Sequence, residues 1–408
     1  MLNRLRGAVL HSPQDVLNEI RSLHPELSAL RRRIHAHPEL GFEEVKTAAL
    51  VAEKLRAWGL EVTEGIGKTG VVGTLRGNRA GMRAIGLRAD MDALPIHEET
   101  GLPHASEIAG IMHACGHDGH VAMLLGAARY LAEHPEFYGT VQFVFQPAEE
   151  GRGGARAMLE DGLFERFPCD AVYGLHNSPS LPVGRFATRR GAMMAACDRW
   201  SVIFHGPGGH GGSTPHLTAD VSVALGYFLL GLQTIVSRNI SSSDQAVVSV
   251  GYIDGGSAKA PNVMPAEVRV DGVARSYTIG VRDILEQRIR DLAARLAAAQ
   301  DCTAEVSYRR GGEALVNHDK QVALAIASAT ALVGAGMVDG DLRPSTGGED
   351  FARMLQRRPG AFMLIGAGAK SDNSRPGLHT PRYDFNDEII PMGAAYWVEL
   401  VRTELATP

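Results

Sequence analysis

The chain has 408 residues, of which 45% are hydrophobic and 21% charged, and its formal net charge is −5 at pH 7. These values are typical of a globular protein large enough for two domains. A slightly acidic chain without a run of Lys and Arg lacks the basic surface that binds nucleic acid or a membrane. We therefore expect a small-molecule or peptide substrate.

Two further features place the chain among intracellular proteins. Residues 1–10 contain two arginines and only a brief apolar run, so they do not resemble a signal peptide, and we find no run of about 18 apolar residues that could span a bilayer. The four cysteines, at positions 115, 169, 197 and 302, are scattered and argue against a disulfide framework. We expect a cytoplasmic protein.

Taken in chain order, the first predicted elements alternate between helices and strands. Residues 14–58 have helical spacing of apolar side chains. Short apolar runs predict strands, and longer stretches between some of them predict helices. The strands are expected at 71–75, 83–89, 140–145, 171–175 and 362–365, and the helices at 120–134, 152–164 and 319–334. This alternation predicts an α/β sheet with helices on its faces.

Between these elements the pattern changes to βαββαβ. Strands are expected at 200–204, 246–252, 267–274 and 304–308, and helices at 219–238 and 281–299. This order is that of a ferredoxin-like domain. We predict a discontinuous catalytic domain formed by residues 1–193 and 311–408, and an inserted domain formed by residues 194–310.

Polar side chains follow several predicted strands directly. Ligands of open α/β sheets bind beyond the carboxyl ends of the strands, so these positions are candidates for a site. They comprise Asp90 and Asp92, Glu149 and Glu150, His176 and Asn177, and, after a Gly-rich loop, His379. Cys115 and His117 stand two positions apart, so in an extended stretch they face one ion. Cysteine, histidines and carboxylates at one edge predict a metal site.

Each of these residues also has a simpler interpretation. A Cys-x-His pair is often incidental, adjacent glutamates are usually solvated, Asp90 suits a turn or a helix N-cap, and a lone histidine such as His176 is often a hydrogen-bonded core residue. The glycine-rich stretch 205–212 lacks dinucleotide-binding spacing and suits a loop that carries His210 towards a ligand. The joint occurrence of these residues favours a functional site over the separate structural interpretations.

Nine stretches resemble the aminoacylase, hippurate hydrolase and indole-acetyl-amino-acid hydrolase branch of the dinuclear metallopeptidases. They are Arg33–Glu44, Arg88–Pro95, Met112–His120, Gln146–Gly151, Gly174–Asn177, Gly208–Gly211, Asn262–Pro265, Gly347–Phe351 and Leu378–Pro381. They follow the family order across nearly the whole chain. The resemblance implies a zinc-peptidase-like α/β/α catalytic domain with an inserted lid that also forms a homodimer or homotetramer.

The resemblance also implies roles for individual residues. Two divalent ions per subunit would be held by Cys115, His117, Glu150, His176 and His379, and Glu149 would be the general base. Asp90 would orient a ligand. His210 would reach an active site, that of the partner subunit, to stabilise the oxyanion. A thiolate ligand favours Zn, Mn, Co or Ni over Mg or Ca.

The implied reaction is hydrolysis of the amide bond of an N-acyl amino acid by a metal-bridging water, with Glu149 acting first as base and then as acid. Asn262 or Arg275 on the lid is a candidate for the substrate carboxylate, although a surface strand charge explains Arg275 equally well. Two alternatives stay open. One is a metallo-carboxypeptidase or dipeptidase that cleaves peptide bonds, and the other is a non-catalytic, metal-stabilised binding protein.

Overall fold

The computed structural model describes residues 11–368 and 376–408, so the N-terminal segment discussed above lies outside the described residues. The chain divides into two compact units. The first comprises Met1–Gly191, Val316–Arg343 and Asp350–Pro408, and the second comprises Ala192–Leu315 and Pro344–Glu349. The return of Pro344–Glu349 to the second unit was not anticipated. It is fixed there by the backbone of Ala195, whose N–H lies 3.1 Å from the carbonyl oxygen of Ser345 and 3.0 Å from that of Gly347.

The first unit is built on a mixed sheet with the order β1-β2-β4-β3-β5-β16-β6-β15. Its strands are β1 (Glu61–Ile66), β2 (Gly70–Arg76), β3 (Arg79–Asp90), β4 (Tyr138–Gln146), β5 (Ala171–Pro182), β6 (Phe186–Ala187), β15 (Val338–Asp339) and β16 (Gly360–Gly368). The four central strands β4, β3, β5 and β16 run parallel. Strands β1 and β2, which no pattern had predicted as a pair, form an antiparallel hairpin at one edge.

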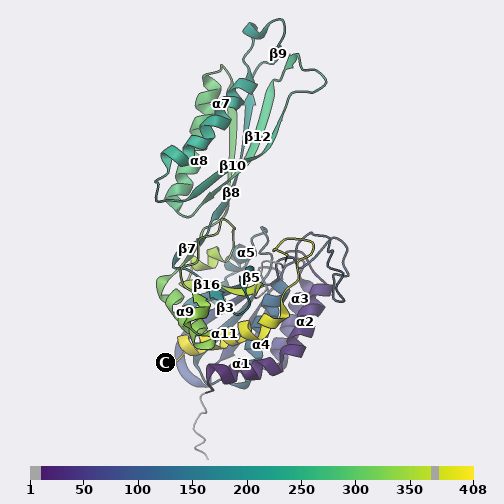
Figure 1. The fold of residues 1–408 in the computed structure, drawn as a ribbon. Helices are drawn as coiled ribbons and strands as arrows, with labels where there is room; N and C mark the ends of the chain where they lie inside the picture. Colours follow the sequence, from purple (N-terminus) through teal and green to yellow (C-terminus); the bar gives the residue numbers. More distant parts are fainter. Residues whose placement is uncertain (1–10, 369–375) are drawn as a thin grey trace, which may run out of the picture. The chain divides into compact units, whose positions relative to one another are not determined.

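Helices pack against this sheet (Figure 1). The longer ones are α1 (Pro13–Ser22), α2 (His24–Ala36), α3 (Val45–Ala57), α4 (His117–Glu133), α9 (Asp319–Val333) and α11 (Ile390–Glu404). The shorter ones are α5 (Gly154–Glu160), α6 (Leu163–Arg166) and α10 (Ala352–Leu355), with 3₁₀ turns η3 (Ala335–Met337) and η4 (Asp387–Ile389). The single helix expected over 152–164 is two, because Gly162 adopts a left-handed φ of 80° between them.

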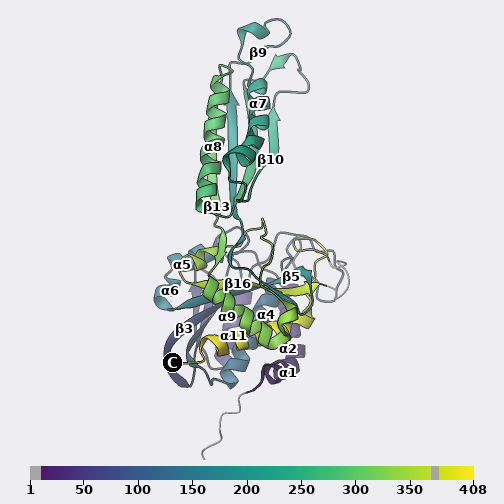
Figure 2. The same cartoon turned by 60° about the vertical axis from the view of Figure 1, so that its left-hand side comes forward.

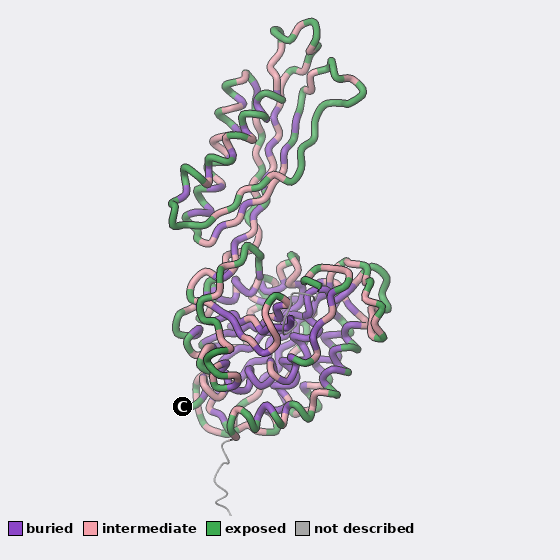
Figure 3. Tube along the Cα trace, viewed as in Figure 1, coloured by how far each residue is buried: buried purple, intermediate pink, exposed green. Residues whose placement is uncertain are grey.

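The strands that lead to the predicted site are buried on both faces. Ile85, Leu87 and Ala89 of β3 are at most 2% exposed, and the last six residues of the strand are all buried. Figure 3 shows the buried residues concentrated in the sheet and the inner helices. A central parallel strand covered on both faces requires such an apolar run. Strands β3 and β4 run parallel and end at Asp90 and Gln146, which are register partners, so the polar residues that follow them begin at one edge of the sheet.

The second unit contains the βαββαβ order: β8 (Ala196–His205), α7 (Val221–Thr234), β10 (Ala246–Gly255), β12 (Glu267–Ser276), α8 (Ile279–Ala298) and β13 (Thr303–Gly312). Its sheet order β10-β12-β8-β13 is the ferredoxin-like one, and α7 and α8 pack against the sheet (Figure 2). Smaller elements are β9 (Gly209–His210), η1 (Pro215–Leu217), η2 (Ile235–Asn239) and β11 (Val263–Met264). Strands β7 (Gly191–Met194) and β14 (Leu315–Asn317) pair where the chain passes between the units.

One helical stretch of the second unit, Val221–Asn239, is long and apolar enough to cross a membrane by length and composition, so the sequence expectation that no such stretch exists was too strict. Core helices of soluble proteins pass the same test. Here Val221, Phe228 and Leu232 are fully buried in the second unit's core. The cytoplasmic location remains a prediction.

Candidate metal centre

The loop before α4 places Cys115 and His117 at the start of a buried helix. Gly116 between them has a φ of 89°, and a Cβ there would lie 2.5 Å from both Asn177 Nδ2 and Tyr383 Oη. Glycine is therefore required both by the backbone and by the close approach. Asn177 Nδ2 donates to the carbonyl oxygen of Cys115 at 2.7 Å, which fixes the backbone that carries the thiol.

The five residues expected to bind metal lie around the Cys115 sulfur. Cys115 Sγ is 3.5 Å from His176 Nε2 and 3.4 Å from His379 Nε2, and His379 Nε2 is 3.2 Å from Glu150 Oε1. Donor atoms of Cys115, His117 and Glu150 all lie within 4.8 Å of one another. One thiol, three imidazoles and one carboxylate from four separate segments thus form one donor set of the kind that holds transition metals.

Hydrogen bonds on the outer side of the set orient two of its imidazoles. His117 Nδ1 lies 3.2 Å from Asp92 Oδ1, and His176 Nδ1 lies 2.7 Å from the carbonyl oxygen of Asn177. When Nδ1 carries the proton, Nε2 is left as a lone pair that faces inwards, as metal-binding histidines require. His117 Nε2 is buried and has no hydrogen-bond partner among the described residues, which fits a position occupied by an ion.

Asp92 is a functional candidate that sequence reasoning left without a role. Besides orienting His117, it accepts the backbone N–H of Glu150 at 2.9 Å, so it connects two members of the donor set. The signal was present in the Asp-x-Asp spacing of Asp90 and Asp92, but the sequence could not show which of the two would contact His117.

The pKa shifts of Cys115, His176 and His379 indicate that the donor set stabilises positive charge. Burial alone would raise the pKa of Cys115, but His176 and His117 lower it to about 6. Burial disfavours a charged His176, yet the thiolate raises its pKa to about 9. Hydrogen bonds to Cys115 and Glu150 raise the pKa of His379 to about 10. Protons held here occupy the place that a cation would take.

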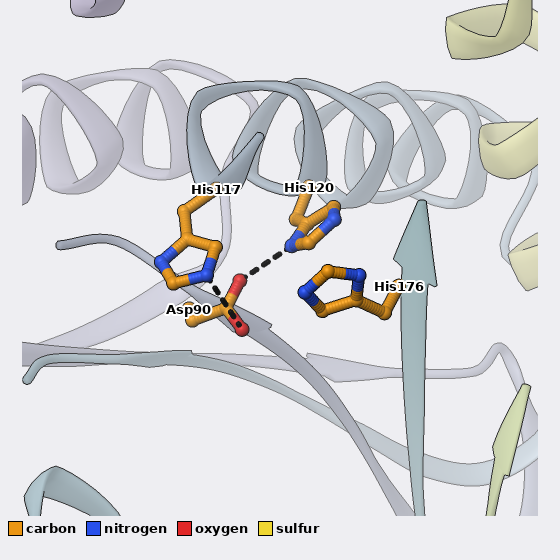
Figure 4. Close-up of side chains that lie close together, drawn as sticks. All are labelled: Asp90, His117, His120 and His176. Atoms are coloured by element: carbon orange, nitrogen blue, oxygen red, sulfur yellow. Dashed lines mark hydrogen bonds and ion pairs between the residues drawn. The ribbon is translucent and has the colours of Figure 1, made fainter. Parts of the chain in front are cut away.

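A second group, formed by Asp90, His117, His120 and His176, also has donor atoms within 4.8 Å (Figure 4). His120 cannot serve there as a ligand, because Nδ1 bonds Asp90 Oδ1 at 2.6 Å and Nε2 accepts the backbone N–H of Asn177 at 3.1 Å. Burial lowers the pKa of His120 to about 3, so the ring is neutral. Sequence reasoning missed His120, although it lies three residues after His117 on the same helical face.

Asp90 is completely buried and has both carboxylate oxygens engaged. Oδ1 faces His120, and Oδ2 accepts Arg88 Nη1 at 2.7 Å and lies 3.7 Å from His117 Nε2. Burial would raise its pKa, but Arg88, His117 and His120 hold it well below its usual range. Asp90 therefore fixes its neighbours as an anion, and the contact to His117 Nδ1 comes from Asp92 instead.

Glu149 immediately precedes the ligand candidate Glu150 but faces a different partner. The backbone N–H of Asp350 lies 3.4 Å from Glu149 Oε1. The side chain of Asp350 is held in turn by Gln146 Nε2 at 2.7 Å and the Ala155 N–H at 2.9 Å. Glu149 is thus a half-buried carboxylate one residue before Glu150 of the donor set, and it contacts the segment around Asp350.

The candidate residues of the second unit lie at its two ends. His210 and Asn262 are neighbours, since β9 pairs with β11 and the Gly211 N–H donates to the carbonyl oxygen of Asn262 at 2.8 Å. Arg275 pairs with Cys197 at the far end of β12, eight residues along the strand from Glu267, or about 26 Å at 3.3 Å per residue. One unit therefore does not bring Asn262 and Arg275 together.

His210 is presented for donation from Nε2. Its Nδ1 lies 3.2 Å from the backbone N–H of Gly212 and 3.3 Å from that of Ser213, both of which donate to it. In the neutral ring the proton is then on Nε2. The side chain is exposed on its own unit.

Comparison with known proteins matches residues 86–403 to the model of peptidase family M20/M25/M40. The chain belongs to this family. It is 40% identical to a hippurate hydrolase of Campylobacter jejuni, over 95% of this chain and 98% of the relative. It is 37% identical to an N-acetylcysteine deacetylase of Bacillus subtilis (95% and 99% covered) and 35% identical to a thermostable carboxypeptidase of Saccharolobus solfataricus (92% and 95%).

Among solved structures, this family member is similar to a dinuclear metal-binding M20 peptidase of Bacillus subtilis, with a TM-score of 0.82 and 33% identity over 95% of this chain and 100% of that one. The family assignment expected from the nine sequence stretches is confirmed, as is the mixed α/β fold.

Proposed function

We propose that this protein hydrolyses the amide bond of N-acyl amino acids, releasing a carboxylic acid and a free amino acid. The observation that carries the proposal is the pair Glu149 and Glu150: Glu150 groups with Cys115 and His117, while Glu149, one residue earlier in the chain, lies outside that group. Family membership and relatives named for hippurate and N-acetylcysteine support this substrate class.

The donor set fits two divalent ions held by Cys115, His117, Glu150, His176 and His379. The inward lone pair of His117 Nε2 and the lowered pKa of Cys115 support this, as does the dinuclear relative. Ions bound there supply Lewis acidity that polarises the acyl carbonyl and acidifies the attacking water. The thiolate favours Zn, Mn, Co or Ni.

Glu149 carries the proton through the reaction. It takes a proton from the attacking water and later delivers it to the leaving amine, so the same carboxyl serves as base and then as acid. The Asp350 N–H, 3.4 Å from Glu149 Oε1, helps to hold this carboxylate in place for the transfer. Asp90, with both oxygens engaged, keeps the buried histidines in place without taking a proton itself.

His210 supplies a donor to the oxyanion, and Asn262 beside it contacts the substrate. Because Arg275 lies at the other end of the second unit, His210 and Arg275 of one chain do not serve the same site. This arrangement supports a homodimer in which His210 and Asn262 enter the active site of the partner subunit. A good oxyanion donor lowers the activation barrier by about 3 to 4 kcal/mol.

The test is a substrate panel with purified protein supplied with Mn, Co or Zn. Hippurate, N-acetyl amino acids, indole-acetyl amino acids and dipeptides are compared by kcat/KM, and we expect the N-acyl amino acids to be preferred. A preference for dipeptides would favour the peptidase alternative, which is consistent with the similarity to a carboxypeptidase. Reversible loss of activity on chelation separates an enzyme from a binding protein.

Glu149→Gln is the decisive variant. We expect a loss of kcat of about 10³-fold, within the range for removal of a general acid–base group, while metal content measured by plasma mass spectrometry stays at the wild-type value. Near-normal turnover in this variant would exclude the proposed mechanism.

A further inference from the structure

The segment Glu39–Glu44, between α2 and α3, has no role in the chemistry proposed above, yet it contacts two of the loops that carry site residues, those after β3 and β4. Leu40 forms a parallel bridge with Ala93, and the Ala93 N–H donates to the carbonyl oxygen of Glu39 at 2.8 Å. On the other side, Arg152 Nη1 donates to the carbonyl oxygen of Gly41 at 2.9 Å. The segment therefore lies against the loop after β3 and the turn after β4.

The turn after β4, Pro147–Glu150, has a strained backbone directly before the proposed base. Ala148 adopts a φ of 52°, a left-handed conformation that costs a non-glycine residue roughly 1 to 2 kcal/mol. Such a conformation persists only when surrounding contacts hold it. The Ala148 carbonyl accepts the Gly154 N–H at 2.9 Å, and its own N–H donates to Glu44 Oε1 at 2.8 Å.

Both oxygens of the buried Glu44 carboxylate accept hydrogen bonds, one of them from this turn. Its side chain is 0% exposed, and its second oxygen accepts the hydroxyl of Thr69 at 2.5 Å. Glu44 also stands at the N-cap position of α3 but makes no side-chain cap bond there. The cap bonds come from Glu39, which accepts the backbone N–H groups of Lys46 at 3.0 Å and Thr47 at 2.9 Å. Two glutamates of one segment thus have separate tasks.

Close packing brings the segment to the turn. A Cβ on Gly41 would lie 2.9 Å from Ala148 Cα, so only glycine permits this approach. The next residue, Phe42, has a φ of 67°, which is unusual for a bulky side chain. Left-handed residues on both sides of one contact indicate that the two segments determine each other's backbone.

We propose that Glu44 is a positioning residue of the hydrolysis, which holds Ala148 in its left-handed conformation and thereby aims Glu149 at the reacting water. This inference rests on the proposed role of Glu149. Glu44 does not touch the donor set; it acts through the peptide that precedes the base. Misplacement of a reacting group by about 1 Å can cost 100-fold in rate.

The test compares Glu44→Ala, Glu44→Gln and Glu39→Ala in the metal-loaded protein. We expect Glu44→Ala to lower kcat about 100-fold with KM and metal content near wild type, and Glu44→Gln to restore most of kcat because its amide oxygen can accept the Ala148 N–H. Glu39→Ala is the matched control: it loses two α3 cap bonds, so Tm falls while kcat stays at the wild-type value.

Hydrogen exchange at the Ala148 amide gives a readout independent of catalysis. It should be protected in the wild type and in Glu44→Gln, and exchange faster in Glu44→Ala. Wild-type kcat or unchanged exchange in Glu44→Ala would overturn the inference. If Glu44→Ala does not fold, the variant Thr69→Val is measured instead, because it removes only the hydroxyl that donates to Glu44 Oε2. A reduced kcat in Thr69→Val supports the inference, and an unchanged kcat overturns it. An active Glu149→Gln would instead refute the proposed base, while the exchange result would still report on the turn.

Discussion

At the scale of single residues, the four cysteines show how surroundings decide chemistry. Burial raises the pKa of Cys169 to about 12, whereas Cys115, equally buried, has a pKa lowered to about 6 by His176 and His117. The thiolate is the form that binds metal. The same side chain is therefore inert in one place and a ligand candidate in the other.

Cys115→Ala should lose bound metal. Removal of groups that only support ligands commonly weakens metal affinity about 10- to 100-fold, and loss of a ligand placed among three imidazoles should exceed that. The measurement is the metal content of purified protein after dialysis. Cys169→Ala is the matched control and should keep the wild-type content. Full metal content in Cys115→Ala, or oxidation of Cys115 in active, metal-loaded enzyme, would contradict its role as a ligand.

At the scale of elements, a buried ionic network ties α2 to the start of α4. Arg31 and His35 of α2 both contact Asp118, at 3.3 and 2.8 Å, and all three side chains are fully buried. Arg31 Nε also bonds Asp387 at 2.8 Å. Asp118 follows His117 in the chain, so the network holds the end of α4 from which a ligand candidate projects.

This network predicts a pH dependence of stability. Burial opposes a charged His35, but Asp118 raises its pKa to about 9, above the 6.5 of the unfolded chain. Its contribution is therefore fully present below pH 6.5 and lost as pH rises through about 9. The difference corresponds to about 3 kcal/mol of unfolding free energy. Asp118, whose pKa is lowered, adds no slope in this range.

Urea unfolding of metal-loaded protein between pH 6 and 10 provides the measurement. The unfolding free energy of the wild type should fall across this range relative to that of His35→Asn. Because the other titrating groups and the metal are common to both proteins, the difference between the two curves reports on His35. Parallel curves would refute the assignment.

At the scale of the whole molecule, the second unit leaves several large apolar side chains of α7 and β10 exposed. Leu230 and Tyr227 of α7 are 72% and 53% exposed, and Tyr252 and Ile253 of β10 are 51% and 52% exposed. Strand β10 is also an edge of its sheet. Edge strands and exposed apolar side chains are features of association surfaces.

We therefore expect a homodimer formed through α7 and β10. Light scattering after size exclusion should give twice the chain mass of 43.6 kDa, and Leu230→Asp with Tyr252→Asp should give the monomer. Ile279→Asp, at a 64% exposed position of α8 outside this surface, is the control and should remain dimeric. Because His210 would act in the partner's site, the monomeric variant should also lose kcat. A monomeric wild type would exclude the arrangement.

The sequence by itself predicted most of the larger helices and strands, because hydrophobic periodicity is a local property, and its resemblance to a family predicted the set of donor residues. Cys115, His117, Glu150, His176 and His379 could all be named, since each belongs to a stretch with a family resemblance. Tertiary structure decided what each contacts. Asp92, not Asp90, orients His117, His120 is fully engaged, and Arg275 lies far from His210. The task of Glu44 also depends on two segments about 100 residues apart that meet at Ala148, and no periodicity within either segment encodes that meeting.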